Sequence, residues 1–312
     1  EHLVVRDFES RGITLRSTRH GLVRHCLVGD ASKFDTGGQG YGIEIGGKFD
    51  LTEDMSQYSN NNWLYCNEVR RIASNEHPRA VRHGILLQYW TNHNLIEGNT
   101  IREAMLDAFD LHGENEHHNE FRFNTVIDGG ESGFGVGNPC KTCDHDDTGD
   151  YNWIHHNTIV GTQTGVEITL GTSRTLVEAN TVRDLVPRNA KTRGIHIVEQ
   201  SRLNPGELND GNVLRGNVIH GAERGIELSD APNTVVEENA IFDNKGEGIL
   251  VVANSPGWIA RNNVVACNGS GIVFDAANKP ALIEGNRTEC EPRPTPLPVW
   301  PSPCEASVNA TP

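Results

Sequence analysis

The sequence predicts an all-β protein, a right-handed parallel β-helix of about ten coils, because two short motifs recur along its 312 residues. The first motif carries apolar residues and ends at an Asn, as in NHNLIEGNTI and DYNWIHHNTI. The second is Gly-apolar-x-apolar, as in GIEI and GVEI, and it falls between the Asn positions. Alternation with period two indicates short strands, and a repeat of roughly 23 residues with longer insertions indicates a solenoid.

The recurring Asn predicts a ladder of stacked side chains at a tight turn. Asn tolerates left-handed backbone, and its amide can hydrogen-bond to the Asn above and below. A leucine-rich repeat would need a denser Leu pattern. The Asn positions expected in the ladder are Asn67, Asn99, Asn124, Asn157, Asn180, Asn217, Asn239, Asn262 and Asn286, with Cys26 in the equivalent place one coil earlier.

The repeat predicts one β-helix domain over residues 1–289 and a Pro-rich tail over residues 290–312. We expect the tail to cap the last coil, since an open end would expose strand edges. The first coil shows no cap, which suggests that an earlier segment has been removed.

Net charge argues against two classes of partner. The chain carries a formal charge of -15 and a pI near 5.3, whereas nucleic acids and anionic membrane surfaces attract clustered Lys and Arg. No apolar run approaches the roughly 20 residues of a membrane-spanning helix.

The chain has seven cysteines, and a disulfide that would staple the Pro-rich tail favours an oxidising compartment, so we expect a secreted or periplasmic protein. Cys290 and Cys304 bracket the tail and are expected to form a disulfide. Cys140 and Cys143 favour a short-loop disulfide over zinc, because a second C-x-x-C is absent. We expect Cys26 and Cys66 either to pair or simply to pack, and Cys267 to be a core or ladder thiol.

Stacking equivalent residues of successive coils turns the repeat into a surface map. In Gly-apolar-x-apolar the two apolar residues face the core, while the residue between them and the residue after them face outward. The first outward row is predicted to be Thr14, Glu44, Leu86, Asp110, Gly135, Glu167, His196, Glu227, Leu250 and Val273. The second is predicted to be Arg16, Gly46, Gln88, His112, Gly137, Thr169, Val198, Ser229, Val252 and Asp275.

This map predicts a groove over the middle coils. The stretch SGFGVGN places Gly135 and Gly137 in the outward rows, so its coil forms a shallow saddle. Asp110 and His112 lie on one side of the saddle and Glu167 on the other, with Asp110 and Glu167 roughly 9 to 10 Å apart. Loops that wall the groove are expected at residues 29–40, 46–62, 70–83, 137–152, 183–193 and 198–211.

A polysaccharide or oligosaccharide is the predicted ligand of this groove. Tyr89 and Trp90 could stack on sugar faces, and we expect Gln88, Arg193, Glu227 and Glu44 to contact the substrate as well. The catalytic candidates are Asp110, His112, Glu167 and His196. A carboxylate two residues before an imidazole on one strand can orient it, which makes His112 a candidate general acid or base near neutral pH.

The stretch AFDLHG resembles the Gly-Phe-Asp-Pro-His motif of the mannuronan C5-epimerases. The resemblance implies a right-handed β-helix in which Asp110 and His112 line the groove and help to remove the C5 proton of a uronate. Leu111 stands where the family has Pro, and Asp107 where it has Tyr. The family's carboxylate on the next coil has no counterpart.

Three functional interpretations remain open. In a polysaccharide lyase or epimerase, His112 is the base, and the cations that neutralise the substrate would come from residues such as Arg82, Lys191, Arg193 and Arg224. In an inverting glycoside hydrolase, Asp110 and Glu167 form the carboxylate pair. A protein that only binds glycans, or a structural spacer, is the third.

Calcium is the one cofactor that the sequence suggests. An acidic protein could bridge to a polyanionic substrate through Ca²⁺, which prefers oxygen ligands. The loop CDHDDTGD offers Asp144, Asp146, Asp147 and Asp150.

Overall fold

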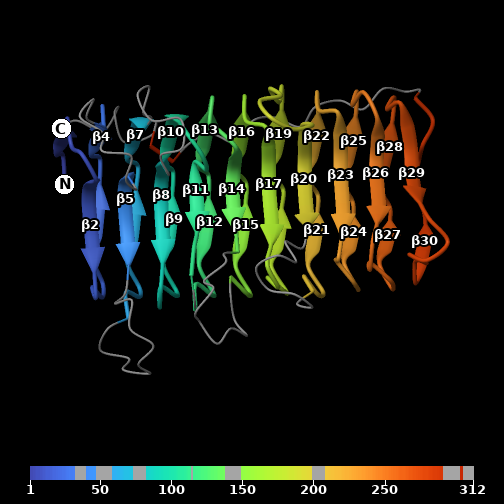
Figure 1. Ribbon diagram of the computed structural model, residues 1–312, viewed down its shortest axis with the longest axis horizontal. Coiled ribbons are helices and arrows are strands. Elements are labelled where there is room, and N and C mark those ends of the chain that lie inside the picture. The colour runs from blue at the N-terminus through green and yellow to red at the C-terminus, as the bar shows by residue number, and fades with distance from the viewer. Residues whose placement is uncertain are drawn as a thin grey trace.

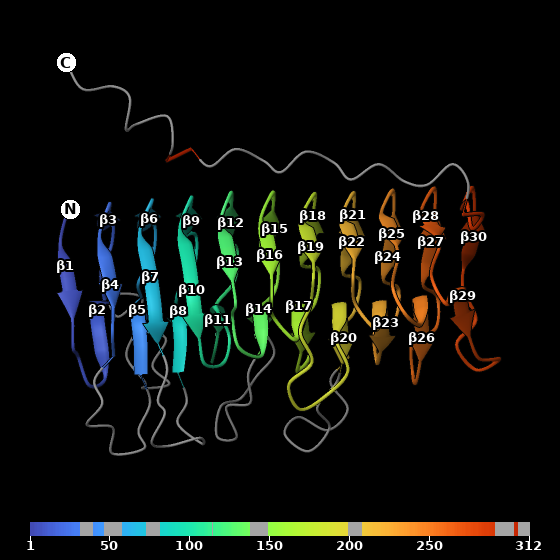
Figure 2. The same ribbon diagram turned by 90° about the horizontal axis from the view of Figure 1, so that it is seen from above.

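The computed structural model describes residues 1–31, 40–46, 58–72, 82–113, 115–137, 149–198, 208–290 and 303–304. Their strands form three parallel sheets of ten strands, and every third strand along the chain joins the same sheet. The coils follow one another along the long axis, from the N-terminus to the last coil (Figure 1), and the view turned by 90° shows the same stacking from above (Figure 2). The predicted β-helix of about ten coils is therefore confirmed.

The strands are short, as the period-two pattern predicts. The first sheet contains β1 (Val4–Arg6), β4 (Leu27–Gly29), β7 (Glu68–Ile72), β10 (Thr100–Ala104), β13 (Thr125–Ile127), β16 (Thr158–Val160), β19 (Thr181–Arg183), β22 (Val218–His220), β25 (Ala240–Phe242) and β28 (Val264–Ala266). The second contains β2 (Arg11–Arg16), β5 (Gly40–Gly46), β8 (Arg82–Gln88), β11 (Phe109–Leu111), β14 (Ser132–Val136), β17 (Thr164–Thr169), β20 (Arg193–Val198), β23 (Arg224–Ser229), β26 (Glu247–Val252) and β29 (Ser270–Phe274). The third contains β3 (Leu22–Arg24), β6 (Trp63–Tyr65), β9 (Leu95–Glu97), β12 (Glu120–Arg122), β15 (Trp153–His155), β18 (Leu176–Glu178), β21 (Val213–Arg215), β24 (Val235–Glu237), β27 (Ile259–Arg261) and β30 (Leu282–Glu284).

The core is a continuous apolar column inside the three sheets. Aliphatic side chains dominate it, but the coils of β11 and β14 contain three buried phenylalanines. Phe109 and Phe134 stack with ring centroids 4.6 Å apart, and Phe121 meets both rings edge-on. This packing fixes the backbone of β11 and β14 from the inside, and these two strands carry the candidate site on their outer face. None of the described residues forms a helix long and apolar enough to cross a membrane.

The predicted Asn ladder is present, with one correction. In each coil the backbone N–H and the side-chain amide both donate to the next Asn, as Asn99 does to Oδ1 of Asn124 at 2.9 and 3.1 Å. Cys26 begins the ladder, because its backbone N–H donates to Asn67 at 3.0 Å. The predicted member Asn262 is wrong: Asn263 accepts the bonds from Asn239, while Asn262 takes left-handed backbone with φ of 55°.

A second Asn ladder, not predicted from the sequence, lines the corner between the second and third sheets. Asn62, Asn94 and Asn119 each donate to the Asn of the following coil, and Asn152 receives the last of these bonds. This corner therefore has its buried backbone groups satisfied in the same way as the first.

The disulfides differ from the expected ones. Cys290 pairs with Cys267, and Cys304 pairs with Cys66. The expected Cys290–Cys304 bond is therefore wrong, as is a thiol at Cys267. The physical reason is coil stacking, which brings Cys290 to within 4.6 Å of Cys267 between Cα atoms, although 23 residues separate them. Cys26 is a free, buried thiol.

Two expectations about cysteines and the tail lie outside the described residues. Cys140 and Cys143 fall in the undescribed range 138–148, so their disulfide stays a prediction. Of the tail, the described residues beyond Cys290 are 303 and 304, and the sulfur atom of Cys304 lies 3.0 Å from the carbonyl oxygen of Gly98. Capping of the last coil stays a prediction as well.

Candidate active site

The strand register places the first outward row as the sequence predicts. Asp110 pairs with Leu86 on one side and with Gly135 on the other. Gly135 pairs with Glu167, which pairs with His196, which in turn pairs with Glu227. Asp110 and Glu167 are therefore two coil steps apart across Gly135.

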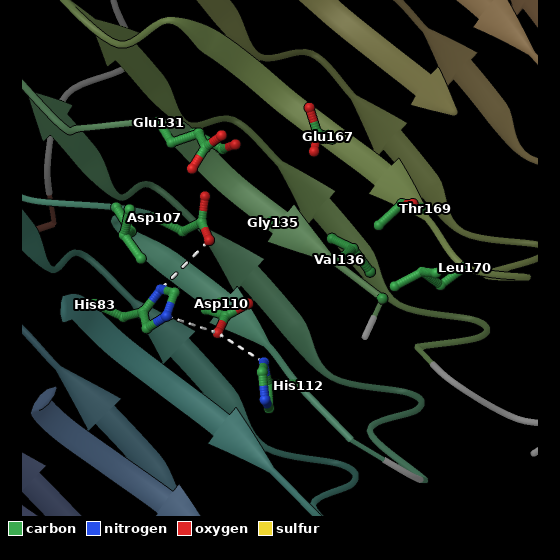
Figure 3. A pocket seen from close by; sticks show the side chains of 13 residues that line it. His83, Asp107, Asp110, His112, Glu131, Gly135, Val136, Glu167, Thr169 and Leu170 are labelled. Atoms are coloured by element: carbon green, nitrogen blue, oxygen red, sulfur yellow. Dashed lines mark ion pairs between the residues drawn. The ribbon is translucent and has the colours of Figure 1, made fainter. Parts of the chain in front are cut away.

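Asp110 lies between two histidines. Its Oδ2 is 3.5 Å from Nδ1 of His112, which follows β11, and 3.4 Å from Nε2 of His83, which comes from β8 of the preceding coil. The other ring nitrogen of His83, Nδ1, is 3.3 Å from Oδ2 of Asp107. Figure 3 shows the resulting chain Asp107–His83–Asp110–His112. His112 is its most open member, with 30% of its side chain exposed, against 6% for His83.

Asp107 occupies the space that Gly135 leaves free. A Cβ built on Gly135 would lie 2.9 Å from Cγ of Asp107, closer than real Cβ atoms approach their neighbours. The glycine saddle is therefore not an empty surface but the seat of a carboxylate. The surface over Gly135, which the sequence predicts to be a shallow saddle, is thus filled by a side chain from the preceding coil.

These groups line a pocket of about 350 Å³ on the outer face of the second sheet. Glu131 borders it from the turn before β14, and Glu167 borders it from β17 (Figure 3). The lining residues are His83, Leu106, Asp107, Asp110, His112, Glu131, Ser132, Gly135, Val136, Gly137, Glu167, Thr169 and Leu170. Four of them are carboxylates, and this set includes no Arg or Lys.

Close contact between these groups shifts their pKa values in different directions. Burial lowers the pKa of His83, but the charge of Asp110 and the contact with Asp107 outweigh it and raise this pKa to about 9. Burial raises the pKa of Asp110, but His83 and His112 together bring it below its ordinary value. Asp107 behaves oppositely, since burial raises its pKa more than His83 lowers it. Burial and the neighbouring carboxylates also raise the pKa of Glu131.

The other two catalytic candidates form a second acid–imidazole pair farther along the row. Nδ1 of His196 lies 3.2 Å from Oε2 of Glu167. His196 is buried and does not line the pocket, whereas Glu167 does. Catalysis by either residue stays a prediction.

Arg193 and Glu227, both predicted to contact substrate, contact each other. Arg224 adds a second ion pair to Glu227 at 2.7 Å and one to Glu247 at 3.1 Å. Burial raises the pKa of Glu227, but hydrogen bonds from Arg224 and Arg193 bring it below its ordinary value. The two arginines are thus engaged by carboxylates of the protein.

Glu44 and Gln88 are buried, whereas the sequence suggests that they lie open in a groove. The Glu44 carboxylate is fully buried, and Arg11, Arg16 and Gln88 surround it. An ion-pair cluster therefore covers the outer face of β5 and β8 at Glu44.

The predicted aromatic pair lies in the turn after β8. Trp90 stacks on Tyr58 with centroids 4.9 Å apart, and Tyr89 lies over Gly113, where a Cβ would be 2.7 Å from its ring. Contact with substrate stays a prediction for both residues.

The predicted calcium loop lies outside the described residues except for Asp150. That carboxylate is buried and accepts a hydrogen bond from the backbone N–H of Ser173 at 2.6 Å. Within the described part of the chain, His83, Asp107 and Asp110 are the group whose ligand atoms lie near enough together, within 4.8 Å, to hold a metal ion. However, the two ring nitrogens of His83 face different carboxylates, which fits an ion-pair chain better than a common metal centre.

Sequence reasoning missed His83, Asp107 and Glu131. His83 and Asp107 each directly precede the Gly or Ala that opens the repeated strand motif. This position forms a third outward row, since Arg11 pairs with Tyr41 and Tyr41 with His83. The same position carries Arg193 and Arg224 farther along the solenoid. Its charged residues were the signal that could have revealed the row.

The profile of the right-handed β-helix region family matches residues 1–182 and 148–290. No curated protein sequence shows significant similarity to the chain.

Solved structures with the same fold share little sequence with the chain. A double mutant of the periplasmic alginate epimerase AlgG has a TM-score of 0.52 and 12% identity, over 86% of this chain and 72% of that chain. An alginate lyase from Paenibacillus sp. str. FPU-7 has a TM-score of 0.50 and 15% identity, over 90% and 87% of the two chains. The catalytic domain of a GH87 alpha-1,3-glucanase in complex with nigerose has a TM-score of 0.51 and 15% identity, over 89% of this chain and 58% of that chain. At these identities the likeness concerns the fold.

Proposed function

The chain belongs to the right-handed β-helix family, and we propose that it is a polysaccharide-processing enzyme that removes the proton beside a uronate carboxylate. The observation that carries this proposal is the pair of Asp110 and His112, 3.5 Å apart at the edge of a pocket. Asp110 is the buried member and His112 the accessible one, as an orienting carboxylate and a general base require.

The proposed chemistry uses two groups of the pocket. His112 accepts the proton from C5 of the uronate. In a lyase, the electron pair left on C5 forms the C4–C5 double bond, the glycosidic C4–O bond breaks, and the leaving oxygen takes a proton from Asp107. In an epimerase, the C4–O bond stays intact and the electron pair left on C5 takes a proton from Asp107 on the opposite face of the ring. Asp107 is suited to donate because its pKa is raised, first by burial.

An acidic pocket can still accept a uronate if some of its carboxyl groups are neutral. The pKa of Glu131 is raised by burial and by the charges of Asp107 and Glu167. A protonated carboxyl group can donate a hydrogen bond to a substrate carboxylate and so replace the arginine or lysine that the lining residues lack. Calcium held by residues 144–150 is the other proposed source of neutralisation.

The comparisons and the disulfides are compatible with this proposal. Two of the structures that share the fold are named as an alginate epimerase and an alginate lyase. Disulfides at Cys66–Cys304 and Cys267–Cys290 support a secreted or periplasmic location.

A glycoside hydrolase is the second candidate, because a different observation favours it. The environment raises the pKa of Asp107 and lowers that of Asp110, as a hydrolase requires for its acid and its base or nucleophile. Such an enzyme would act on a neutral glycan, which the acidic lining does not repel.

Incubation with polymannuronate, polyguluronate, pectate and neutral glucans, each with and without Ca²⁺, tests both candidates. We expect unsaturated-uronate absorbance, or deuterium incorporation at C5 in D₂O, with a uronate polymer. His112→Ala and Asp110→Asn should lower that rate by about 100-fold or more, and His93→Ala, at an exposed turn histidine outside the pocket, should not. New reducing ends without either signal would indicate the hydrolase. No turnover of any uronate polymer would refute the proposal.

A further inference from the structure

His83 is a buried imidazole that the proposed chemistry does not use directly. It lies in β8 with 6% of its side chain exposed, one coil before Asp110. Both of its ring nitrogens face carboxylates, Nδ1 toward Asp107 at 3.3 Å and Nε2 toward Asp110 at 3.4 Å. A protonated imidazole spreads its positive charge over both nitrogens, so it can pair with a carboxylate on each side of the ring.

The surroundings of His83 favour that positive charge. Glu131 adds a third carboxyl group on the pocket side. The Tyr41 ring stacks beside it with centroids 5.9 Å apart, and burial raises the pKa of that phenol, so it stays neutral. The adjacent Arg82 directs its guanidinium away, to the carbonyl oxygen of Glu9 at 2.9 Å. Among the lining residues, the cation between Asp107 and Asp110 is therefore His83 itself.

We propose that His83 is a positioning residue whose imidazolium clamps Asp107 and Asp110 in different roles. It holds Asp110 ionised behind His112, where Asp110 orients the base. It also fixes Asp107 over Gly135, where that carboxyl group faces the pocket as the proton donor. The role of the clamp in turnover rests on the proposed function, whereas the charge of His83 does not.

The directions of the pKa shifts agree with this arrangement. The pKa of His83 is raised to about 9, because Asp110 and Asp107 overcome the effect of burial. Asp110 has a lowered pKa and Asp107 a raised one, although both are buried beside the same imidazole. Asp107 is therefore the carboxyl group of the pair that holds its proton to the higher pH.

Replacing His83 by an amide tests the clamp. Gln in place of His83 can reach toward the Nε2 position, and Asn toward the Nδ1 position, but neither carries a charge. Loss of the cation raises the pKa of Asp110, which must be ionised, and of Asp107, which must hold a proton, so both limbs of the pH–rate profile should move to higher pH. We expect a shift of about one pH unit, and hence about a tenfold lower kcat on the acidic limb. KM should change little, because only 6% of the His83 side chain is exposed.

His155→Gln is the matched control. His155 is also buried and lies 3.1 Å from a carboxylate, Glu120, but it belongs to the third sheet, away from the pocket. Its variant should keep the wild-type profile, and thermal unfolding of all variants shows whether each is folded. A His83→Gln profile that superimposes on the wild type would overturn the proposal.

An NMR titration of the wild-type protein tests the charge independently of activity. The His83 ring signal, identified by its absence in His83→Gln, should keep its imidazolium shift at pH 8. A neutral His83 at pH 7 would refute the clamp. If the enzyme turned over no uronate polymer, the proposed function would fail while this titration still decided the state of His83.

Discussion

At the scale of single residues, the candidate site depends on a glycine that makes room for a carboxylate. Asp107 lies over Gly135, and the contact is too close for any larger residue at position 135. The pair joins two coils, since Asp107 precedes β11 and Gly135 belongs to β14. Gly135 thus has a packing role that concerns the chemistry of the pocket rather than backbone conformation.

Gly135→Ala should therefore disturb the site more than the fold. The added Cβ would lie 2.9 Å from Cγ of Asp107 and push the carboxyl group away from His83. We expect turnover of the substrate to fall by about tenfold or more, with unfolding free energy lowered by only ~1 kcal/mol. Steady-state kinetics and urea unfolding measure the two effects.

Gly46→Ala is the control for this substitution. Gly46 lies on the same sheet, and a Cβ built on it would lie 3.3 Å from its nearest neighbour, Glu44 Oε1. Gly46→Ala should leave turnover unchanged, because this contact is away from Asp107. Equal losses of turnover in the two variants would show that Asp107 is not seated as described.

The sequence predicts half of the acid–imidazole chain and misses the other half. Alternation within a strand correctly places Asp110 in an outward row. It gives no direction for His83 and Asp107, because both stand before the Gly or Ala at which the repeated alternation begins. The strand register, and not the period-two pattern, places them in an outward row.

At the scale of elements, the Asn ladders stabilise the corners of the solenoid. Each Asn satisfies backbone and amide groups of neighbouring coils that are removed from water. The sequence predicts one ladder from its spacing, but the adjacent Asn262 and Asn263 fit the spacing equally well. The hydrogen bonds settle the register on Asn263, since it faces inward while Asn262 faces outward.

Asn157→Ala should destabilise the protein clearly. The amide of Asn157 accepts two bonds from Asn124, at 2.9 and 3.0 Å, and donates to Phe121 and Asn180. Alanine would leave these buried partners unsatisfied, at a cost of roughly 2 to 4 kcal/mol in unfolding free energy. Chemical denaturation monitored by circular dichroism measures the loss.

Asn189→Ala provides the comparison for the ladder variant. Asn189 is exposed, and its hydrogen bond to Gln163 comes from the backbone N–H, which the substitution retains. We expect a change within about 0.5 kcal/mol. A loss at Asn157 as small as that at Asn189 would contradict a stabilising ladder.

At the scale of the whole molecule, two disulfides tie together parts of a solenoid whose coils otherwise contact only their neighbours. Cys267–Cys290 closes a segment with a sequence separation of 23, about one coil. Cys66–Cys304 has a separation of 238 and so connects an early coil to the C-terminal tail. Sequence spacing favours pairing of the cysteines that bracket the tail, whereas stacking of coils brings distant cysteines together. Pairing is therefore the feature that the repeat pattern predicts least.

Removing the long-range bond should cost more than removing the local one. In the chain-entropy account, a cross-link stabilises by restricting the unfolded chain, which amounts to ~5 kcal/mol for a loop of the larger size and ~3 kcal/mol for the smaller. We compare Cys66→Ser/Cys304→Ser with Cys267→Ser/Cys290→Ser, each as a pair so that no unpaired thiol is created. The midpoint of guanidinium unfolding should fall further in the first variant. A larger fall in the second variant would contradict the chain-entropy account of these two cross-links.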